Sequence, residues 1–283
     1  MPLRIFTNIS SQNAQRVLDI NNNMLGRAIS RIASGIRIRT AADDAAGLAI
    51  TEQLKADSRT LRQGTRNLND GVALVNVAEG AMGEQSGILI RMRELASQAA
   101  TGTIGQTERQ TIDLEFQQLK AELDRITNTT EFAGGGILDG TLAASNPKHL
   151  ILQIGATTAT DDRIDLNQAL DLTTVSAANL GIGNSRISTE GDALLALDQL
   201  STAVDELIEI RARAGSVQQR LDRAFNNLNI TIENLNAAVS QISDADLAEE
   251  LTDLTKNQIL VQSGAAMVSQ SNLIPQSVLT LLS

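Results

Sequence analysis

Apolar residues recur every seven positions through much of the first half of the chain. One row begins at Leu54 and continues through Leu61, Leu68, Val75, Met82, Leu89 and Ala96. A second row, offset by three or four residues, holds Ile50, Ala78, Met92 and Ala99 and is interrupted by Asp57, Gly64, Gly71 and Gln85. This 3-4 pattern over about seven heptads predicts one long helix in a coiled-coil seam. The two glycines weaken the helix by roughly 1 kcal/mol each, but they permit close approach of another helix.

The same pattern returns in the second half of the chain. A heptad row begins at Leu200 and continues through Leu207, Ala214, Leu221, Leu228, Leu235 and Ile242, and its companion row runs through Leu197, Val204, Arg211, Gln218, Phe225, Ile232 and Val239. A shorter segment between the two carries Ile112, Phe116, Leu119, Leu123 and Ile126 at 4-3-4-3 spacing. Three helices with matching seams predict a mainly α protein built on a long antiparallel bundle.

The segment between the second and third of these helices has a different texture. Residues 131–147 are rich in glycine and predict turns, among them one at Gly134–Gly136. Residues 149–154 and 163–166 predict two short strands joined by a long link. We therefore expect a small β-hairpin that caps one end of the bundle.

Both ends of the chain carry a helical stripe that is separated from the bundle by a break. The N-terminal stripe is Ala14, Leu18, Asn21, Leu25, Ala28 and Ile32, and the C-terminal one is Leu247, Leu254, Val261, Val268, Pro275 and Leu282. Gly35 is expected to end the first helix, and Asp43 or Asp44 to cap the next. Residues 243–246 form the second break and supply further caps. The breaks therefore divide two terminal segments, residues 1–42 and 243–283, from an inner bundle of residues 43–242.

Each terminal segment has too little apolar surface to fold alone. Ordering about 40 residues costs on the order of 60 kcal/mol, which requires roughly 2,400 Å² of apolar burial. One amphipathic helix against one partner helix does not bury so much. We therefore expect the ends to be weakly ordered in the free chain and to fold on contact with other copies. Head-to-tail repetition of that contact builds an open helical polymer.

Composition narrows the possible functions. The chain has 283 residues, no cysteine, no tryptophan, no tyrosine and one histidine, which excludes disulfides and thiolate metal sites. Its net charge of −10 disfavours nucleic acid and anionic membranes as partners. No apolar run is long enough to span a membrane, and the N-terminus lacks a cleavable signal peptide. The chain is therefore expected either to stay in the cytoplasm or to be exported without cleavage.

No residue pattern predicts catalysis, a metal site or a cofactor. His149 has no nucleophile or second histidine near it in sequence, and no Lys-Ser/Thr follows Gly134–Gly136 as a phosphate loop requires. The acidic pairs also lack metal-ligand spacing, and we interpret them as helix caps and solvated faces; they are Asp43/Asp44, Asp161/Asp162, Asp244/Asp246 and Glu249/Glu250. The sequence thus predicts a protein that is not an enzyme.

Several longer motifs occur in order at both ends of the chain. They include AQRVLDINNNMLGRAISRIASGIRIRTAADDAAGLAI, LNDGVALVNVAEGAMGE, RMRELASQAATGT and EFAGGGIL in the first half. In the second half they include ILQIGATTATDDRIDL, a segment from ISTEGDALLALDQL to QISDADLAEEL, and the terminal IPQSVLTLLS. Together these motifs resemble bacterial flagellin over nearly the whole chain. In this family Asn often follows the Phe of EF, whereas here the residue is Ala133.

The resemblance implies a structural subunit that polymerises into the flagellar filament for motility. Residues 1–42 and 243–283 resemble the family's inner-tube domain, in which the N- and C-terminal helices are paired, and residues 43–242 resemble its outer-shell domain. The connector between them would include Gly35, Asp43 and Asp44. Large surface domains that many flagellins carry would lie between Gly140 and Gly191, and this segment is too short to hold them. The family leaves the cell unfolded through the flagellar type III export apparatus, without a cleaved signal, and becomes extracellular.

The resemblance also implies partners and sites. Arg91, Leu95, Gln98 and Glu115 match the patch sensed by a Toll-like innate receptor, and the same face is expected to pack between subunits. Leu279, Leu281 and Leu282 match leucines read by a cytosolic innate sensor. The C-terminal helix resembles the segment held by an export chaperone. Further partners would be copies of the chain itself and the filament cap and hook-junction proteins.

Two alternatives from other functional classes remain open at this stage. A hook–filament junction protein shares such terminal segments but does not form long polymers alone. A general coiled-coil scaffold would form a discrete oligomer at all concentrations, whereas a filament subunit has a critical concentration for assembly.

Overall fold

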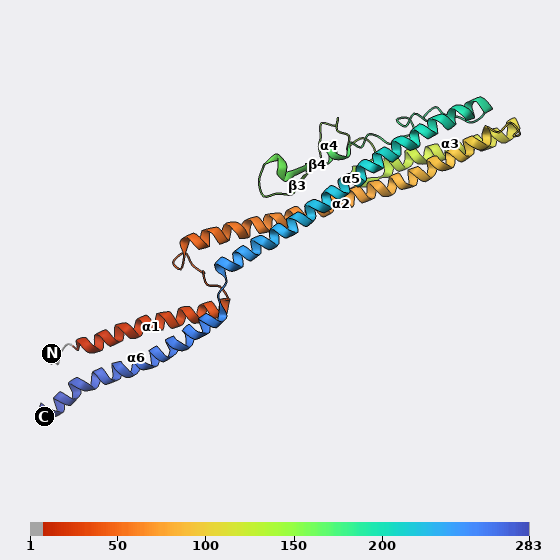
Figure 1. The fold of residues 1–283 in the computed structure, drawn as a ribbon. Coiled ribbons are helices and arrows are strands. Elements are labelled where there is room, and N and C mark those ends of the chain that lie inside the picture. Colours follow the sequence, from red (N-terminus) through yellow and green to blue (C-terminus); the bar gives the residue numbers. More distant parts are fainter. Residues whose placement is uncertain (1–7, 283) are drawn as a thin grey trace. The chain divides into compact units, whose positions relative to one another are not determined.

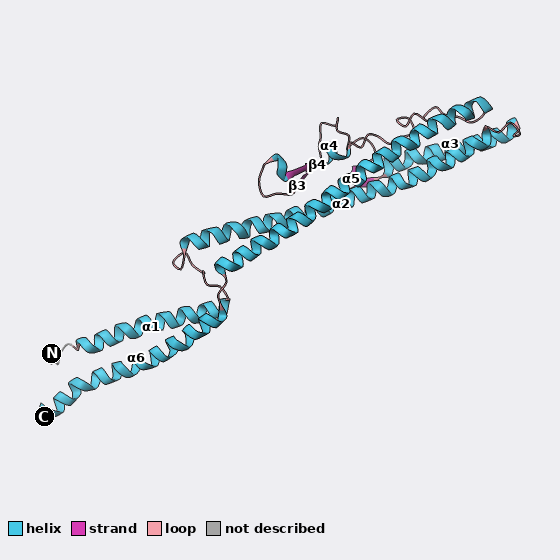
Figure 2. Cartoon of the chain, in the orientation of Figure 1, coloured by secondary structure: helices cyan, strands magenta, loops and turns pink. Residues whose placement is uncertain are grey.

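A computed structural model describes the backbone of residues 8–282 and the side chains of residues 8–273. Helices dominate it, and the strands are few and short (Figure 2). The long helices are α1 (Ile9–Ser34), α2 (Ala45–Ala99), α3 (Gln106–Thr129), α5 (Glu190–Ser243) and α6 (Leu247–Leu282), as Figure 1 shows along the chain. The expectation of a mainly α fold with paired terminal helices and a small β element is confirmed.

The chain forms two compact units. One contains the residues up to Ala56 together with those from Asn234 onward, and the other contains residues Asp57–Glu233. Because α2 and α5 each run without a break across these borders, the domain boundaries at 42/43 and 242/243 remain a prediction. The first is called the terminal unit below, and the second the bundle unit.

The heptad rows form the core of the bundle unit. Leu68, Val75, Met82 and Leu89 of α2 are fully buried, and Leu207, Ala214 and Leu221 of α5 are buried as well. Phe116 and Leu123 of α3 are buried against them in the same cluster. Further along α5 Ile232 is buried as the companion row predicts, but in the first half of the helix the row lies one residue earlier than expected. Its most buried members are Ala203, Ile210 and Val217, whereas Val204, Arg211 and Gln218 are half-buried.

The interrupting residues of the second α2 row have structural roles. Gln85 is fully buried, and its amide nitrogen donates to Thr127 Oγ1 at 2.9 Å and to the carbonyl of Val175 at 3.2 Å. A Cβ at Gly64 would lie 2.2 Å from the carbonyl oxygen of Ile154, and one at Gly71 would lie 2.4 Å from Leu152 Cδ1. The nearest neighbour that these glycines admit is therefore a strand segment, and not the helix that we expected.

That strand belongs to a hairpin of β3 (Ile151–Gln153) and β4 (Arg163–Asp165), which pair antiparallel in the register Leu152↔Ile164. Both strands are shorter than predicted, and β4 ends before residue 166 because the short helix α4 (Leu166–Leu170) begins there. The hairpin lies against the side of α2, where Asn67 Nδ2 donates to the carbonyl of Gln153 at 2.7 Å. The expectation that it caps an end of the bundle is therefore wrong.

A second, smaller hairpin pairs β1 (Glu131–Phe132) with β2 (Gly135–Gly136). The two linking residues, Ala133 and Gly134, both have positive φ, of 51° and 81°. Positive φ at both central residues is the geometry of a tight hairpin turn, which favours Asn or Gly at the first position. The turn predicted at Gly134–Gly136 is confirmed, and Ala133 occupies its strained corner.

Helix α3 holds the irregular segment before α5 by bonds from side chains to backbone. Lys120 Nζ donates to the carbonyls of Gly183 and Ser185, at 2.9 and 3.2 Å. The carboxylates of Asp113 and Asp124 accept from the amides of Ile187 and Ala177, each at 2.8 Å. Burial lowers the pKa of Lys120, although Asp113 opposes that shift. No sequence signal had predicted this arrangement.

Candidate functional site

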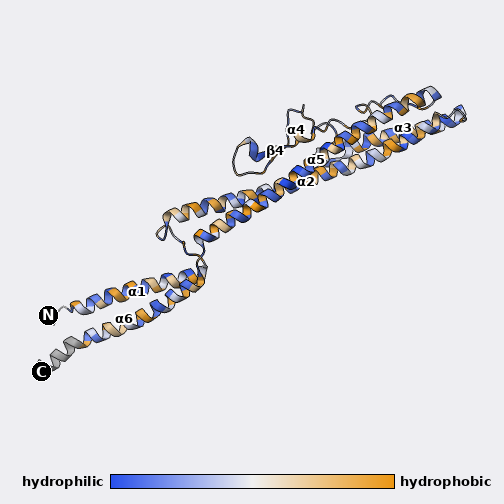
Figure 3. Cartoon of the chain, in the orientation of Figure 1, coloured by the Kyte–Doolittle hydropathy of each residue, from blue (hydrophilic) through white to orange (hydrophobic). Residues whose placement is uncertain are grey.

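The terminal unit carries its apolar side chains mainly on the outside. Among its described residues, Ala28 and Ile38 are the buried apolar ones. Large apolar side chains are instead exposed along both terminal helices, where Figure 3 shows hydrophobic residues recurring. Those of α1 are Ile9, Val17, Ile20, Met24 and Ile29, and those of α6 are Leu247, Leu251, Ile259, Leu260, Met267 and Leu273.

The seam between α1 and α6 is correspondingly small and polar. The α1 stripe faces it as predicted, with all six residues buried or half-buried, although Arg31 beside Ile32 is half-buried too. On α6 the predicted Leu254, Val261 and Val268 are half-buried in the seam, but Leu247 is exposed, which the heptad row did not anticipate. Between them lie Glu250, Asn257, Gly264 and Ser271 at seven-residue intervals.

Specific contacts fix the two helices antiparallel. Near the connector, Arg31 Nη1 lies 3.2 Å from Glu250 Oε1. In the middle, a Cβ at Gly264 would lie 3.2 Å from Leu18 Cδ1, so the helices approach closely there. Toward the chain ends, Asn8 Nδ2 donates to the carbonyl of Ser271 at 2.8 Å. The pair is therefore held in register by polar bonds, while most of its apolar surface is left open.

The two connectors are hydrogen-bonded to each other. Gly35, with φ of 69°, ends α1 in the left-handed conformation, and its amide donates to the carbonyl of Arg31. Its own carbonyl accepts from the amide of Ala245 at 3.0 Å, and the Arg37 amide donates to the carbonyl of Ser243 at 2.7 Å. The prediction that Gly35 ends the first helix is confirmed, and the backbone pairing with residues 243–245 is new.

The two aspartates of the first connector have separate tasks. Asp44 Oδ1 accepts from the amides of Ala46 and Gly47, both at 3.0 Å, and thus caps α2. Asp43 Oδ2 accepts from the backbone and hydroxyl of Thr40 and from the amide of Arg39, and these bonds hold the pKa of Asp43 below its usual value. On α6, Asp246 Oδ1 accepts from the amide of Ala248 at 2.8 Å, so a cap within residues 243–246 is also confirmed.

The four residues of the predicted receptor patch divide into two groups. Arg91 on α2 and Glu115 on α3 form an ion pair on the surface, with Nη2 and Oε1 2.8 Å apart, and Gln98 is exposed one heptad further along α2. Leu95 is only 2% exposed and packs in the bundle core. A partner can therefore touch Arg91, Gln98 and Glu115, while Leu95 positions the helix beneath them. Leu279, Leu281 and Leu282 lie beyond residue 273, outside the described side chains.

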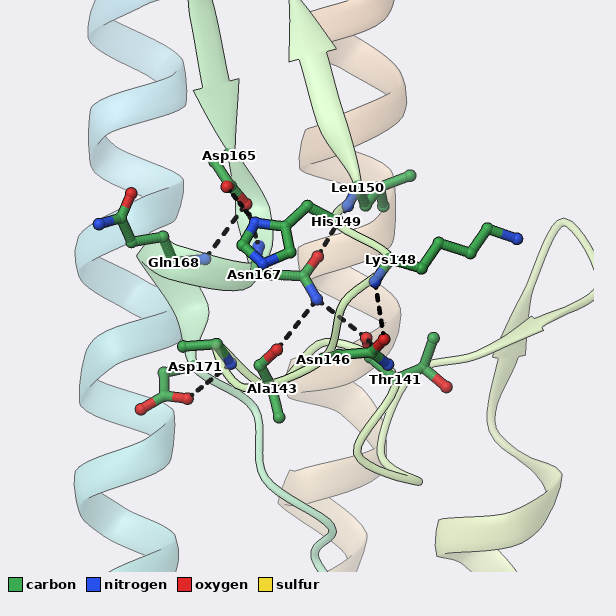
Figure 4. A network of polar contacts seen from close by, with 11 residues as sticks. Thr141, Ala143, Asn146, Lys148, His149, Leu150, Asp165, Asn167, Gln168 and Asp171 are labelled. Atoms are coloured by element: carbon green, nitrogen blue, oxygen red, sulfur yellow. Dashed lines mark hydrogen bonds and ion pairs between the residues drawn. The ribbon is translucent and has the colours of Figure 1, made fainter.

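A cavity of about 360 Å³ lies in the bundle unit, between α2, the β1–β2 turn and the β3–β4 hairpin. Its apolar wall includes Leu74, Phe132, Leu142, Leu152 and Leu166. A polar network beside it fixes the loop before β3 (Figure 4). There the fully buried Asn167 accepts from the amide of Leu150 at 2.7 Å, and its Nδ2 donates to the carbonyls of Thr141 and Ala143.

His149 belongs to this network and pairs with Asp165 through Nδ1. Asp165 in turn caps α4 by accepting from the amides of Asn167 and Gln168. Burial raises the pKa of Asp165, but the hydrogen bonds from His149 and from these amides outweigh it, so the pKa lies below its usual value. With both partners engaged in structural bonds, the geometry holds a loop and offers no nucleophile.

Two further findings concern the described part of the chain. No group of three or more His, Asp or Glu side chains there could hold a metal ion. No helix there is long and apolar enough to cross a membrane.

Comparison with known families gives two matches that together cover most of the chain. The family described as the bacterial flagellin N-terminal helical region matches residues 5–143. The family described as the bacterial flagellin C-terminal helical region matches residues 197–282. The intervening residues 144–196 contain the β3–β4 hairpin and the segment held by α3.

Curated relatives match over nearly their full length. Flagellin from Halalkalibacterium halodurans is 39% identical over 275 residues, which covers 97% of this chain and 98% of that protein. Flagellin from Bacillus subtilis is 38% identical and covers 99% and 100%. The solved structure of a flagellar hook-associated protein from Vibrio parahaemolyticus covers 71% of this chain and all of that one, with a TM-score of 0.57. At 12% identity this likeness shows the fold alone.

Proposed function

Because the chain belongs to the bacterial flagellin family, we propose that its terminal helices polymerise it and become stably packed only in the filament. The chain is a structural subunit of the extracellular flagellar filament, and its family is structural rather than enzymatic. What the family leaves open is which surfaces of this chain carry assembly, and when its ends become ordered.

The outward placement of apolar side chains on α1 and α6 carries the proposal. Eleven large apolar residues on these helices are exposed, while the seam contains Glu250, Asn257, Gly264 and Ser271. Fully burying one such side chain contributes on the order of 1.5–3 kcal/mol. Contact with neighbouring copies would therefore supply far more stabilisation than the seam between the two helices of one copy.

The same surface supports proposals about export. No charged residue follows Lys256, so residues 257–283 form an uncharged segment that exposes Ile259, Leu260, Met267 and Leu273 before assembly. An export chaperone that covers this segment would prevent premature association. We propose passage through the flagellar type III export apparatus without a cleaved signal, followed by contact with the cap and hook-junction proteins at the ends of the filament.

Recognition by host innate receptors is a separate proposal, and it concerns the bundle unit. Arg91, Gln98 and Glu115 offer an exposed polar surface on α2 and α3, and Leu95 supports it from the core. For the cytosolic innate sensor the candidates remain Leu279, Leu281 and Leu282. Both proposals are tested by alanine substitution at these positions in a receptor-signalling assay with purified monomer.

Deletion of the C-terminal segment tests the polymerisation proposal most directly. A chain that ends at Ile242 is expected to keep the bundle helices but to form no filaments when it is seeded with sheared filament fragments, even at 100 times the critical concentration of the full chain. Normal elongation of this truncated chain, seen by electron microscopy, would contradict the proposal. Full-length chain that fails to elongate on the same seeds would instead favour a junction protein.

Hydrogen exchange tests the timing of order. In dilute monomer the amides of α1 and α6 are expected to exchange at least 100 times faster than those of α2 and α5, because their helices bury little apolar surface. In assembled filaments the difference should disappear. Equal protection in the monomer would show that the terminal pair is stable by itself.

A further inference from the structure

The cavity beside the β3–β4 hairpin is an apolar recess that the rest of the bundle unit does not fill. Leu74, Leu142 and Leu166 on its wall are buried, while Leu150 at its rim is 41% exposed. Asn167 fixes the loop of residues 141–150 that borders the recess, and Leu152 packs in the space that a Cβ at Gly71 would occupy. The wall of the recess is therefore fixed by bonds and packing within the bundle unit.

The charged side chains at the rim of the recess differ in whether they have an ion-pair partner. His149 is paired with Asp165, and Asp70 of α2 also borders the recess. Lys148 uses its backbone amide to bond Asn146, but no ion-pair partner of its ammonium group is found in the described chain. Figure 4 shows its side chain extending away from the polar network. The rim thus offers one cation available to an acidic partner.

A surface with an exposed leucine and acidic neighbours, complementary to the recess and its cation, lies at the start of α5. Leu195 is 66% exposed, and the acidic residues Asp192 and Asp198 stand three positions before and after it on the helix. Asp205 and Glu209 continue the same face. Leu114 on α3 is similarly exposed, at 68%, but Gln110, Thr111 and Gln118 surround it on its face. Of these two prominent leucines, Leu195 alone combines an apolar tip with an acidic surround.

Within one copy the recess and Leu195 cannot meet. Gln218 Nε2 bonds Asn76 Oδ1, and Arg211 lies 3.7 Å from Glu79, so α5 and α2 run antiparallel in a fixed register. In that register Leu195 stands near the C-terminal end of α2, more than twenty helical residues from Leu74, or on the order of 30 Å. Any contact between the two features must therefore join different copies.

The geometry points to a subunit contact in which Leu195 of one copy enters the apolar recess of the next, with Asp198 facing Lys148. The contact joins two different surfaces, so it repeats without closing and suits an open helical polymer. Burial of the leucine supplies the affinity, and the charge pair sets the orientation. This inference rests on the proposed polymerisation and adds a specific lateral or axial contact to it.

Cysteine cross-linking tests this contact cleanly, because the natural chain has no cysteine. The variants Leu195→Cys and Leu150→Cys are each doped at one part in ten into wild-type filaments, separately and together, and are then oxidised. We expect a disulfide-linked dimer only when both variants are present and only in filaments. Leu114→Cys with Leu150→Cys is the matched control, and it should give no dimer.

The outcomes distinguish a failure of this subunit contact from a failure of the proposed polymerisation. Filaments that contain both variants but yield no dimer, or that yield as much with Leu114→Cys, would overturn the contact while leaving polymerisation intact. Wild-type chain that forms no filaments would overturn the proposed function. As a second measurement, Lys148→Glu should raise the critical concentration about two- to fivefold, and adding Asp198→Lys should reverse that rise. No rise with Lys148→Glu would count against the charge pair.

Discussion

The bundle unit and the terminal unit are both built from long antiparallel helices with seven-residue periodicity, yet they use it in opposite ways. In the bundle unit Leu68, Val75, Met82 and Leu89 are fully buried between helices. In the terminal unit the seam alternates half-buried Leu254 and Val261 with polar or small residues, and leucines and isoleucines face outward. A heptad pattern therefore identifies a seam, but the residues outside the seam decide whether a helix pair is complete.

The two units therefore differ in where their stability comes from before and after assembly. A bundle whose core is filled by its own side chains needs no partner, whereas a pair that exposes its apolar residues remains marginal until neighbours cover them. The helices of the terminal unit are thus expected to be less stable than those of the bundle unit in the free subunit. In the filament the helices of both units should be similarly stable.

Matched truncations of leucine should give the largest contrast between the units. Leu89→Ala is expected to lower the free energy of unfolding of the monomer by about 2–5 kcal/mol, because it empties a filled core site. Leu25→Ala removes the same atoms from a half-buried seam and should cost less than about 1 kcal/mol in the monomer. Urea denaturation followed by circular dichroism measures both. Equal losses of unfolding free energy would show that the terminal pair is packed as completely as the bundle core.

Two glycines of α2 in the bundle unit differ in what packs against them, and their substitution should change stability in opposite directions. Gly64→Ala places a Cβ against the backbone of Ile154 and should destabilise by about 1–3 kcal/mol, with loss of protection in the hairpin. Gly83, in the same helix, has no neighbour within 4 Å, so Gly83→Ala should stabilise by up to about 1 kcal/mol. Thermal denaturation gives the sign of each. A stabilising Gly64→Ala would mean that the hairpin does not rest on α2.

The β1–β2 turn offers a smaller effect. Ala133 has a φ of 51°, which costs a residue with a Cβ roughly 1 kcal/mol, so Ala133→Gly should raise the stability of the bundle unit by up to that amount. Ala121→Gly, on the exposed face of α3, should lower it by about as much. Scanning calorimetry compares the two. Changes of the same sign would show that the turn is not strained.

Acid should affect the hairpin least of all, and only at low pH. The folded-state pKa values of Asp165 and Asp162 lie below the ordinary 3.8, the latter through hydrogen bonds from Thr157. Their stabilisation is therefore complete well above pH 3.8 and is lost as the pH falls through the folded-state values. Amide exchange in β3 and β4 should rise over that range. In Asp165→Asn the rise should be smaller, and an unchanged rise would exclude Asp165 as its source.

Much of the fold was predictable, because heptad spacing depends on sequence-local geometry. The rows from Leu54 and Leu200, the end of α1 at Gly35 and the cap at Asp44 all followed from spacing and residue type. The placement of the hairpin did not, because the spacing of Gly64 and Gly71 indicates close approach without saying what approaches. The hold of α3 on residues 177–187 depends on bonds to backbone carbonyls and amides, which leave no pattern in the sequence.

The candidate surfaces likewise include residues that the sequence predicted and residues that it did not. Arg91 and Glu115 came from the resemblance to flagellin, and the structure joins them across two helices. The sequence contains the apolar residues of α1 and α6, but its pattern did not tell which of them face outward and which lie in the seam between the two helices. Asn167 and the recess that it helps to form had no signal, because a buried asparagine in a loop-rich segment looks like any turn residue.

The pairing of Gly35 and Arg37 with Ser243 and Ala245 ties together two stretches of chain that lie more than two hundred positions apart. Neither stretch can gain or lose a residue without shifting its partner out of alignment. During evolution, insertions in one connector should therefore be accompanied by compensating insertions in the other. Genetic selection for swimming revertants of a one-residue insertion after Gly35 would reveal this constraint as second-site changes near Ser243.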